Sequence, residues 1–175
     1  MVDDRKVLLA FGANQAGPWG EPAEAIERAL AELDTRGVVV TRVSQLIVTE
    51  PMGPAPQAAY ANATASATTR LEPEALLALL KALEAEAGRR PGPRWGPRPL
   101  DIDILDYQGV VQGWDTPHDP LHPAHLVLPH PELHKRDFVL KPLLEIEPDW
   151  RHPALQASPG ELLDQLVLAN ATKTL

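Results

Sequence analysis

The sequence of 175 residues contains no cysteine. Disulfide bonds and thiolate metal centres are therefore excluded, and the composition fits a reducing compartment, so we expect a cytoplasmic location. A run of about 18 apolar residues, which a membrane-spanning helix needs, is also missing. The first residues, MVDDRKVLLAFGAN, lack the basic segment, long apolar block and small-residue cleavage site of an export signal. We expect no membrane partner.

Basic residues are fewer than acidic ones: the chain has 16 lysines and arginines against 24 acids, and its formal net charge is −8. Nucleic-acid binding needs a basic surface that displaces counterions, so we expect no nucleic-acid partner. Phosphate-binding glycine motifs are missing too: the chain has neither G-x-x-x-x-G-K-[ST] nor G-x-G-x-x-G, and no kinase H-R-D or D-F-G element. A chain of this composition must use side chains if it handles nucleotide phosphates.

Hydrophobic patterns divide the chain into strands and helices. Strands are predicted at 5–11, 37–50, 58–70 and 100–107. Helices are predicted at 21–37 and 71–88, with two shorter ones at 138–146 and 159–169. The segment 108–131 is predicted to be a proline- and histidine-rich loop with room for one short strand. The order β-α-β-β-α-β predicts an α+β plait, an antiparallel sheet with two helices on one face, in a single domain spanning 1–175.

The segment RWGPRPLDIDILDY, residues 94–107, places two acids in an otherwise apolar strand. Successive strand side chains point to opposite faces, so Asp101 and Asp103 share one face and their apolar neighbours share the other. Their Cα atoms are about 6.5 Å apart, which lets both carboxylates flank a hard cation. Mg²⁺ takes one or two protein carboxylates and fills its remaining positions with phosphate oxygens and water. A third acid, Asp106, is out of phase with the pair and is predicted to cap a turn.

Two interpretations of the aspartate pair remain open from the residues alone. D-x-D usually marks a strand with one solvent-facing side, whose acids bind nothing. Four arginines, however, crowd the preceding segment: Arg89, Arg90, Arg94 and Arg98. Guanidinium groups match phosphate oxygens in pairs and keep their charge. The cluster is therefore either a set of structural ion pairs or a site for a metal–polyphosphate complex.

RWGPRPLDIDIL is similar to W-G-P-R-x-L-D-[LI]-D-[LI], the signature of the 6-hydroxymethyl-7,8-dihydropterin pyrophosphokinase family. Three further blocks resemble the family in the same order: FGAN, with Ala13 in place of serine, TEPMGPAPQAAYAN, and LPHPELHKRDFVLKPLLEI. Together the blocks extend from about Val7 to Glu147. The resemblance implies a ferredoxin-like plait. It also implies an enzyme that transfers pyrophosphate from ATP to the hydroxymethyl group of a reduced pterin, releasing AMP, for folate biosynthesis.

The resemblance further implies roles for individual residues. Asp101 and Asp103 would hold two Mg²⁺ ions on the phosphates of ATP, and the implied catalytic residues are Arg89, Arg98, Asp101 and Asp103. The residues implied in ATP binding are Lys81, Glu84, Arg90, Trp95, Arg98, Ile104, His130 and Arg136. The residues implied in pterin binding are Thr49, Pro51, Met52, Gly53, Tyr60, Asn62, Trp95 and Phe138. Among these, Tyr60 and Phe138 would stack on the pterin ring and Asn62 would bind its polar edge.

The expected partners are the small molecules ATP and 6-hydroxymethyl-7,8-dihydropterin, bound by a monomer. The connection from Gly109 to Leu128 is longer than the family usually has, and Lys81 stands where well-known members have glutamine. One alternative is a non-catalytic nucleotide- or pterin-binding module of the same fold. Another is a D-x-D nucleotide-sugar transferase, which predicts a larger chain and a doubly wound sheet that the hairpin order does not favour.

Overall fold

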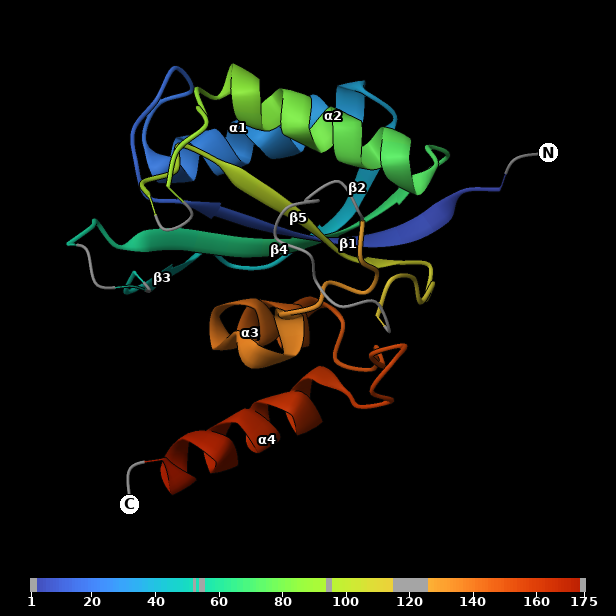
Figure 1. Cartoon of the computed structure of the whole chain (residues 1–175). Coiled ribbons are helices and arrows are strands. Elements are labelled where there is room, and N and C mark those ends of the chain that lie inside the picture. The colour runs from blue at the N-terminus through green and yellow to red at the C-terminus, as the bar shows by residue number, and fades with distance from the viewer. Residues whose placement is uncertain (1–2, 52, 54–55, 94–95, 115–125, 174–175) are drawn as a thin grey trace.

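A computed structural model describes residues 3–51, 53, 56–93, 96–114 and 126–173. This part of the chain forms an antiparallel sheet with helices on both faces (Figure 1). None of the helices described has the length and apolar character needed to cross a membrane.

The elements follow the predicted order, with one strand more than expected. The strands are β1 (Arg5–Ala13), β2 (Val38–Val43), β3 (Ile47–Thr49), β4 (Tyr60–Thr69) and β5 (Asp101–Tyr107). The helices are α1 (Pro22–Thr35), α2 (Pro73–Glu86), α3 (Asp137–Ile146) and α4 (Pro159–Thr172), with a 3₁₀ turn η1 (Leu133–Lys135) before α3. The sheet order is β2-β4-β1-β5, with β3 also paired to β4, and every pair is antiparallel. This arrangement confirms the predicted ferredoxin-like plait.

The sheet separates two hydrophobic cores. Helices α1 and α2 cover one face together, as predicted, while α3 covers the other and α4 lies beyond α3 (Figure 1). Side chains of β1 alternate between the cores: Leu9 and Phe11 pack with α1 and α2, whereas Leu8 and Ala10 pack with α3 and α4. Burial on both faces explains why the first strand is a continuous apolar run rather than an alternating one.

The predicted single strand over 37–50 is wrong, because the structure has two strands separated by residues 44–46. The backbone N–H of Gln45 leaves the sheet and donates to both carboxylate oxygens of Glu145 in α3, at 3.0 and 3.1 Å. The β-branched composition of the segment favours a continuous strand. At the break, the N–H of Gln45 is satisfied instead by an acid that lies 100 residues later in the chain.

A β-bulge at the end of β5 redirects Asp106. The pairing with β1 skips Leu105, so Asp106 lies on the face that carries Asp103, contrary to the prediction that it is out of phase. Its Oδ2 atom accepts hydrogen bonds from the N–H of Gly109 and from Nε1–H of Trp150, both at 3.3 Å. The predicted role of this acid in capping a turn is therefore confirmed.

Candidate active site

Asp101 and Asp103 project from β5 on the side of α3, and both line a cavity of about 370 Å³. The intervening Ile102 and the following Ile104 are buried in the core beneath α1 and α2. The predicted division of faces is thus confirmed. Both acids remain accessible, with side chains 22% and 30% exposed, respectively.

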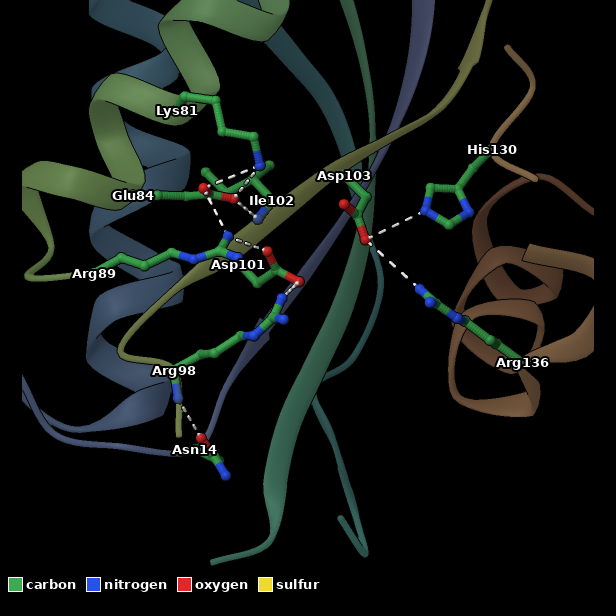
Figure 2. Close-up of polar contacts among 10 residues, drawn as sticks. All are labelled: Asn14, Lys81, Glu84, Arg89, Arg98, Asp101, Ile102, Asp103, His130 and Arg136. Carbon is green, nitrogen blue, oxygen red and sulfur yellow. Dashed lines mark hydrogen bonds and ion pairs between the residues drawn. The ribbon is translucent and has the colours of Figure 1, made fainter. Parts of the chain in front are cut away.

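Two arginines hold the carboxylate of Asp101 (Figure 2). Nη1 of Arg89 lies 2.5 Å from Oδ1, and Nη1 of Arg98 lies 3.0 Å from Oδ2. Burial alone would raise the pKa of Asp101, but the charges of Arg98 and Arg89 outweigh it and the pKa is lowered. Asp101 is therefore ionised at neutral pH.

Asp103 faces the opposite wall of the site (Figure 2). Nε2 of His130 and Nη1 of Arg136 each lie 3.7 Å from its Oδ2. These separations are too long for direct hydrogen bonds. Burial, reinforced by the charge of Asp101, raises the pKa of Asp103 to about 6. Its negative charge is incompletely compensated, a condition that a bound cation relieves.

His130 is a neutral donor in this arrangement. Its Nδ1 accepts the backbone N–H of Glu132 at 3.1 Å, so the ring hydrogen is on Nε2, the atom that faces Asp103. Burial and, secondarily, the charge of Arg136 lower the pKa of His130 to about 4. The side chain can therefore donate a hydrogen bond to a ligand oxygen at any pH above that value.

Glu84 anchors the base of the arginine cluster rather than facing solvent. Its side chain is only 2% exposed, and its Oε1 accepts the backbone N–H of Ile102 in β5 at 2.8 Å. Its Oε2 accepts from Nη1 of Arg89 at 2.8 Å, and Nζ of Lys81 lies within 3.2 Å of both oxygens. Burial, with a contribution from the charge of Asp101, raises the pKa of Glu84. This carboxylate orients Arg89 and Lys81.

A second cavity of about 690 Å³ lies beside the first, and Arg98 lines both. Its wall includes Lys81, Arg89 and Arg90 together with the Gly/Pro segment that precedes β5. Cationic side chains on one cavity wall suit a polyanionic ligand. Three of the four predicted arginines are thus brought together beside the aspartate pair, and the fourth, Arg94, lies outside the described residues.

The first cavity also has a wall suited to a flat heterocycle, formed by Thr49, Tyr60, Asn62 and Phe138. Nδ2 of Asn62 donates to Oγ1 of Thr49 at 2.6 Å, which fixes the carboxamide. Gly12 lies against it: a Cβ atom there would be 3.3 Å from Oδ1 of Asn62. Burial raises the pKa of Tyr60, so its hydroxyl stays protonated. Aromatic rings with one oriented amide are the usual contacts of a planar polar ligand.

Some predicted residues do not join the cavity walls. The side chain of Ile104 is 4% exposed in the core, which leaves its backbone as the part able to meet a ligand. Pro51 and Gly53 lie in the loop after β3 but line neither cavity described here. His130 lines neither cavity as well, although its Nε2 lies 3.7 Å from Oδ2 of Asp103. The predictions for Met52 and Trp95 lie outside the described residues.

Sequence reasoning missed Asn14, which links the two halves of the site. Its Oδ1 accepts the backbone N–H of Arg98 at 2.8 Å. Its Nδ2 donates to Oε1 of Gln57 at 3.1 Å and to the carbonyl of Ala58 at 3.2 Å, just before Tyr60. The one available signal was its place at the end of FGAN, directly after the first strand. Glu132 and Lys135 also line the first cavity and were not predicted.

The plait, the aspartate pair, the arginines and the aromatic cavity together define a site for phosphoryl-type transfer to a flat acceptor. Residues 8–148 match the family model of 7,8-dihydro-6-hydroxymethylpterin-pyrophosphokinase (HPPK), and the chain belongs to this family. It is 38% identical over 173 residues to the 2-amino-4-hydroxy-6-hydroxymethyldihydropteridine pyrophosphokinase of Pseudomonas aeruginosa. That match covers 93% of this chain and 97% of the relative.

The chain is also similar to larger proteins. It is 36% identical over 143 residues to a mitochondrial folate synthesis bifunctional protein of Arabidopsis thaliana. That match covers 82% of this chain and 24% of the relative. The fold matches Plasmodium falciparum HPPK-DHPS, whose structure was determined with pteroate, at a TM-score of 0.71. That match has 13% identity and covers 93% of this chain and 44% of the other, and it bears on the fold alone.

Family membership confirms the predicted activity, an ATP-dependent transfer of pyrophosphate to the pterin in folate biosynthesis. The non-catalytic binding module is not favoured, because the relative that matches almost along its whole length is named a pyrophosphokinase. A nucleotide-sugar transferase is not supported either, because the sheet is an antiparallel plait and not doubly wound.

Proposed function

We propose that Asp101 and Asp103 hold Mg²⁺, as two ions, on the phosphates of ATP. The observation that carries this proposal is the position of the pair, on one strand face and lining one cavity, with arginines beside Asp101 and an incompletely compensated charge on Asp103. Among the described residues, no group of three or more histidines and acids could hold a metal. Phosphate and water oxygens would then complete the coordination, the pattern typical of Mg²⁺. When bound, Mg²⁺ neutralises phosphate charge and acidifies the attacking hydroxyl.

The triphosphate is proposed to cross from the second cavity to the first past Arg98, which lines both. Arg89, Arg90 and Lys81 would contact it from one side, and His130 and Arg136 from the other. Glu84 would act on ATP indirectly, because its carboxylate is occupied by protein donors, and Ile104 would contribute its backbone. Trp95 remains a prediction for both substrates.

The acceptor is proposed to lie between Tyr60 and Phe138, with its polar edge on Asn62. Thr49 orients that amide, and the loop of Pro51, Met52 and Gly53 would close the same side. In the reaction, the hydroxymethyl oxygen forms a bond to the β-phosphorus while the bond from that phosphorus to the α–β bridging oxygen breaks. AMP leaves and the hydroxyl proton passes to solvent. The arginines stabilise the charge that develops on the transferring group.

We further propose that residues 1–175 act as a single domain, as a monomer and in the cytoplasm. The groups proposed to contact both substrates all belong to this chain. Light scattering of the purified protein, with and without ATP, tests the oligomeric state.

The direct test of the proposed reaction is to incubate the protein with Mg²⁺, ATP and 6-hydroxymethyl-7,8-dihydropterin and to record ³¹P NMR spectra. We expect the signals of AMP and a pterin diphosphate ester. ADP as the product would identify a simple kinase, and unchanged ATP would contradict catalysis. An analogue with a 6-methyl group in place of the hydroxymethyl group, which has no attacking oxygen, is the matched control.

A further inference from the structure

Four aromatic rings from three segments pack together, and none of the four lines either cavity. Trp114 belongs to the connection after β5, His134 to η1, and Trp150 and His152 to the segment between α3 and α4. The ring centroid of Trp114 lies 5.1 Å from that of His152, edge to face, and 6.0 Å from that of His134. Trp150 packs on His152 with a centroid distance of 5.7 Å. These four residues are called the aromatic cluster below.

Trp114 fixes one peptide group of the active site. Its Nε1–H donates to the carbonyl oxygen of Pro129 at 2.7 Å. The N–H of the same peptide unit, that of His130, donates to the carbonyl of Leu105 in β5 at 2.9 Å. The Pro129–His130 peptide is therefore held from both of its polar ends, by an indole on one side and by the strand of the aspartate pair on the other. A peptide held at both ends cannot rotate without losing a hydrogen bond.

The same cluster contacts the turn that precedes Arg136. His134 lies in η1, and its ring is 6.0 Å from Trp114 and 6.1 Å from His152. The N–H of Arg136 donates to the carbonyl of Leu133 at 3.2 Å, which closes that turn. Two members of the cluster, Trp114 and His134, thus lie at the backbone segments that carry His130 and Arg136, the two side chains that face Asp103.

The cluster contains buried polar atoms that stability alone does not explain. His152 is 0% exposed, and its Nδ1 accepts the N–H groups of Ala154 and Leu155 at 3.2 and 3.1 Å. In the neutral ring the hydrogen is then on Nε2. That atom and Nδ1 of His134 are buried without a hydrogen-bond partner in the part of the chain described. Unpaired buried nitrogens cost free energy, so packing alone does not account for these two rings.

We propose that Trp114 is a positioning residue for the reaction. Its indole fixes the Pro129–His130 peptide and, through His134, the turn before Arg136, so that both side chains stay 3.7 Å from Oδ2 of Asp103. The inference rests on the proposed contact of His130 and Arg136 with phosphate. It also gives a role to one described residue of the connection that follows β5.

The test compares two tryptophan variants that each remove one indole hydrogen bond. Trp114→Phe keeps a ring against His152 and removes the donor to Pro129. The matched control, Trp150→Phe, removes the donor to Asp106 within the same cluster. For Trp114→Phe we expect a KM for ATP raised about 10-fold and a lower kcat, with the KM for the pterin unchanged, because a misplaced contact affects only the substrate it touches. Trp150→Phe should lower the melting temperature and leave the kinetic constants at wild-type values.

A spectroscopic measurement separates positioning from general loosening. In the wild-type protein the ¹⁵N signals of His130 should show an unprotonated Nδ1 and a protonated Nε2. In Trp114→Phe these signals should move toward each other as the two tautomers mix. If Trp114→Phe does not fold, His134→Leu removes the neighbouring ring and is expected to give the same pattern.

Unchanged ATP kinetics together with unchanged His130 signals in Trp114→Phe would overturn the inference. An equal rise in KM for both substrates, shared by Trp150→Phe, would overturn it as well, since that pattern marks a purely structural role. His130→Ala serves as the reference for the proposed phosphate contact. A wild-type KM for ATP in His130→Ala would contradict the proposed contact of His130 with phosphate. The ¹⁵N signals of His130 in Trp114→Phe test the positioning independently of that contact.

Discussion

Nη1 of Arg89 lies 2.5 Å from Oδ1 of Asp101 and 2.8 Å from Oε2 of Glu84, so one guanidinium group joins the candidate metal ligand to a buried acid (Figure 2). The protein alone thus places a cation where Asp101 would hold Mg²⁺. On the proposed metal role, metal and nucleotide would displace this arginine from Asp101, and the phosphates that arrive with the metal would give it a new partner. Glu84 keeps it within reach during that exchange.

Replacing Arg89 by alanine removes both the competing cation and a phosphate contact. We expect kcat to fall by about 10²- to 10³-fold, as for the loss of one transition-state donor. Mg²⁺ without nucleotide should bind more tightly than to the wild-type protein, because no internal cation competes. Steady-state kinetics and calorimetric titration with Mg²⁺ measure the two effects. Arg36→Ala, which removes an arginine paired with Glu32 and Glu86 on the surface, is the control and should change neither.

Because the pKa of Asp103 is raised in the folded protein, we expect the free energy of unfolding to depend on pH. Its pKa is about 6 in the folded protein and about 4 when unfolded, so the folded state binds the proton more tightly. The free energy of unfolding therefore falls as the pH rises between these values, and activity falls below about pH 6 as the proton displaces metal. Asp103→Asn should raise the free energy of unfolding by about 1–2 kcal/mol at pH 8, after allowance for solvent screening, and leave it unchanged at pH 3.

Urea unfolding of Asp103→Asn and wild type across this pH range, without ligands, checks the sign. The exposed Asp149→Asn serves as the control for loss of one negative charge. A variant less stable than wild type at pH 8 would show that the charge of Asp103 is already compensated, against the proposed metal site.

Asn62 and Thr49 give a test confined to the pterin. Asn62→Ala should weaken pterin binding at least about 10-fold, since a ligand edge is left without its partner, and should not alter ATP binding. Thr49→Val removes the acceptor that orients the amide and should give a smaller loss in the same direction. Fluorescence titration with the pterin measures both variants. Equal affinity in Asn62→Ala and wild type would place the polar edge of the pterin elsewhere.

The parts of the fold that local patterns determine were predictable. Period-two alternation placed Asp101 and Asp103 on one face, and helical spacing located α1 and α2. The two predictions that were wrong, the single strand over 37–50 and the direction of Asp106, involve contacts between distant parts of the chain. At the break after β2, the free N–H is bound by Glu145 of α3, and the altered direction of Asp106 follows from a bulge opposite β1. Neither contact can be read from local propensity.

The site was predictable as a set of residues but not as a network. The arginine cluster was visible in the sequence, yet the pairing of Arg89 with Glu84 joins a loop to a helix and appears only in the folded chain. Asn14 and Trp114 act through backbone groups of Arg98 and Pro129, and side-chain motifs contain no information about such contacts.

The most direct test of the account measures Mn²⁺, in place of Mg²⁺, by electron paramagnetic resonance with α,β-methylene-ATP, an analogue that cannot release AMP. The wild-type protein should immobilise the Mn²⁺–nucleotide complex, and Asp101→Asn and Asp103→Asn should each weaken that binding by at least about 100-fold with the fold intact by circular dichroism. Wild-type spectra and affinities in both variants would contradict the claim that this carboxylate pair holds the metal.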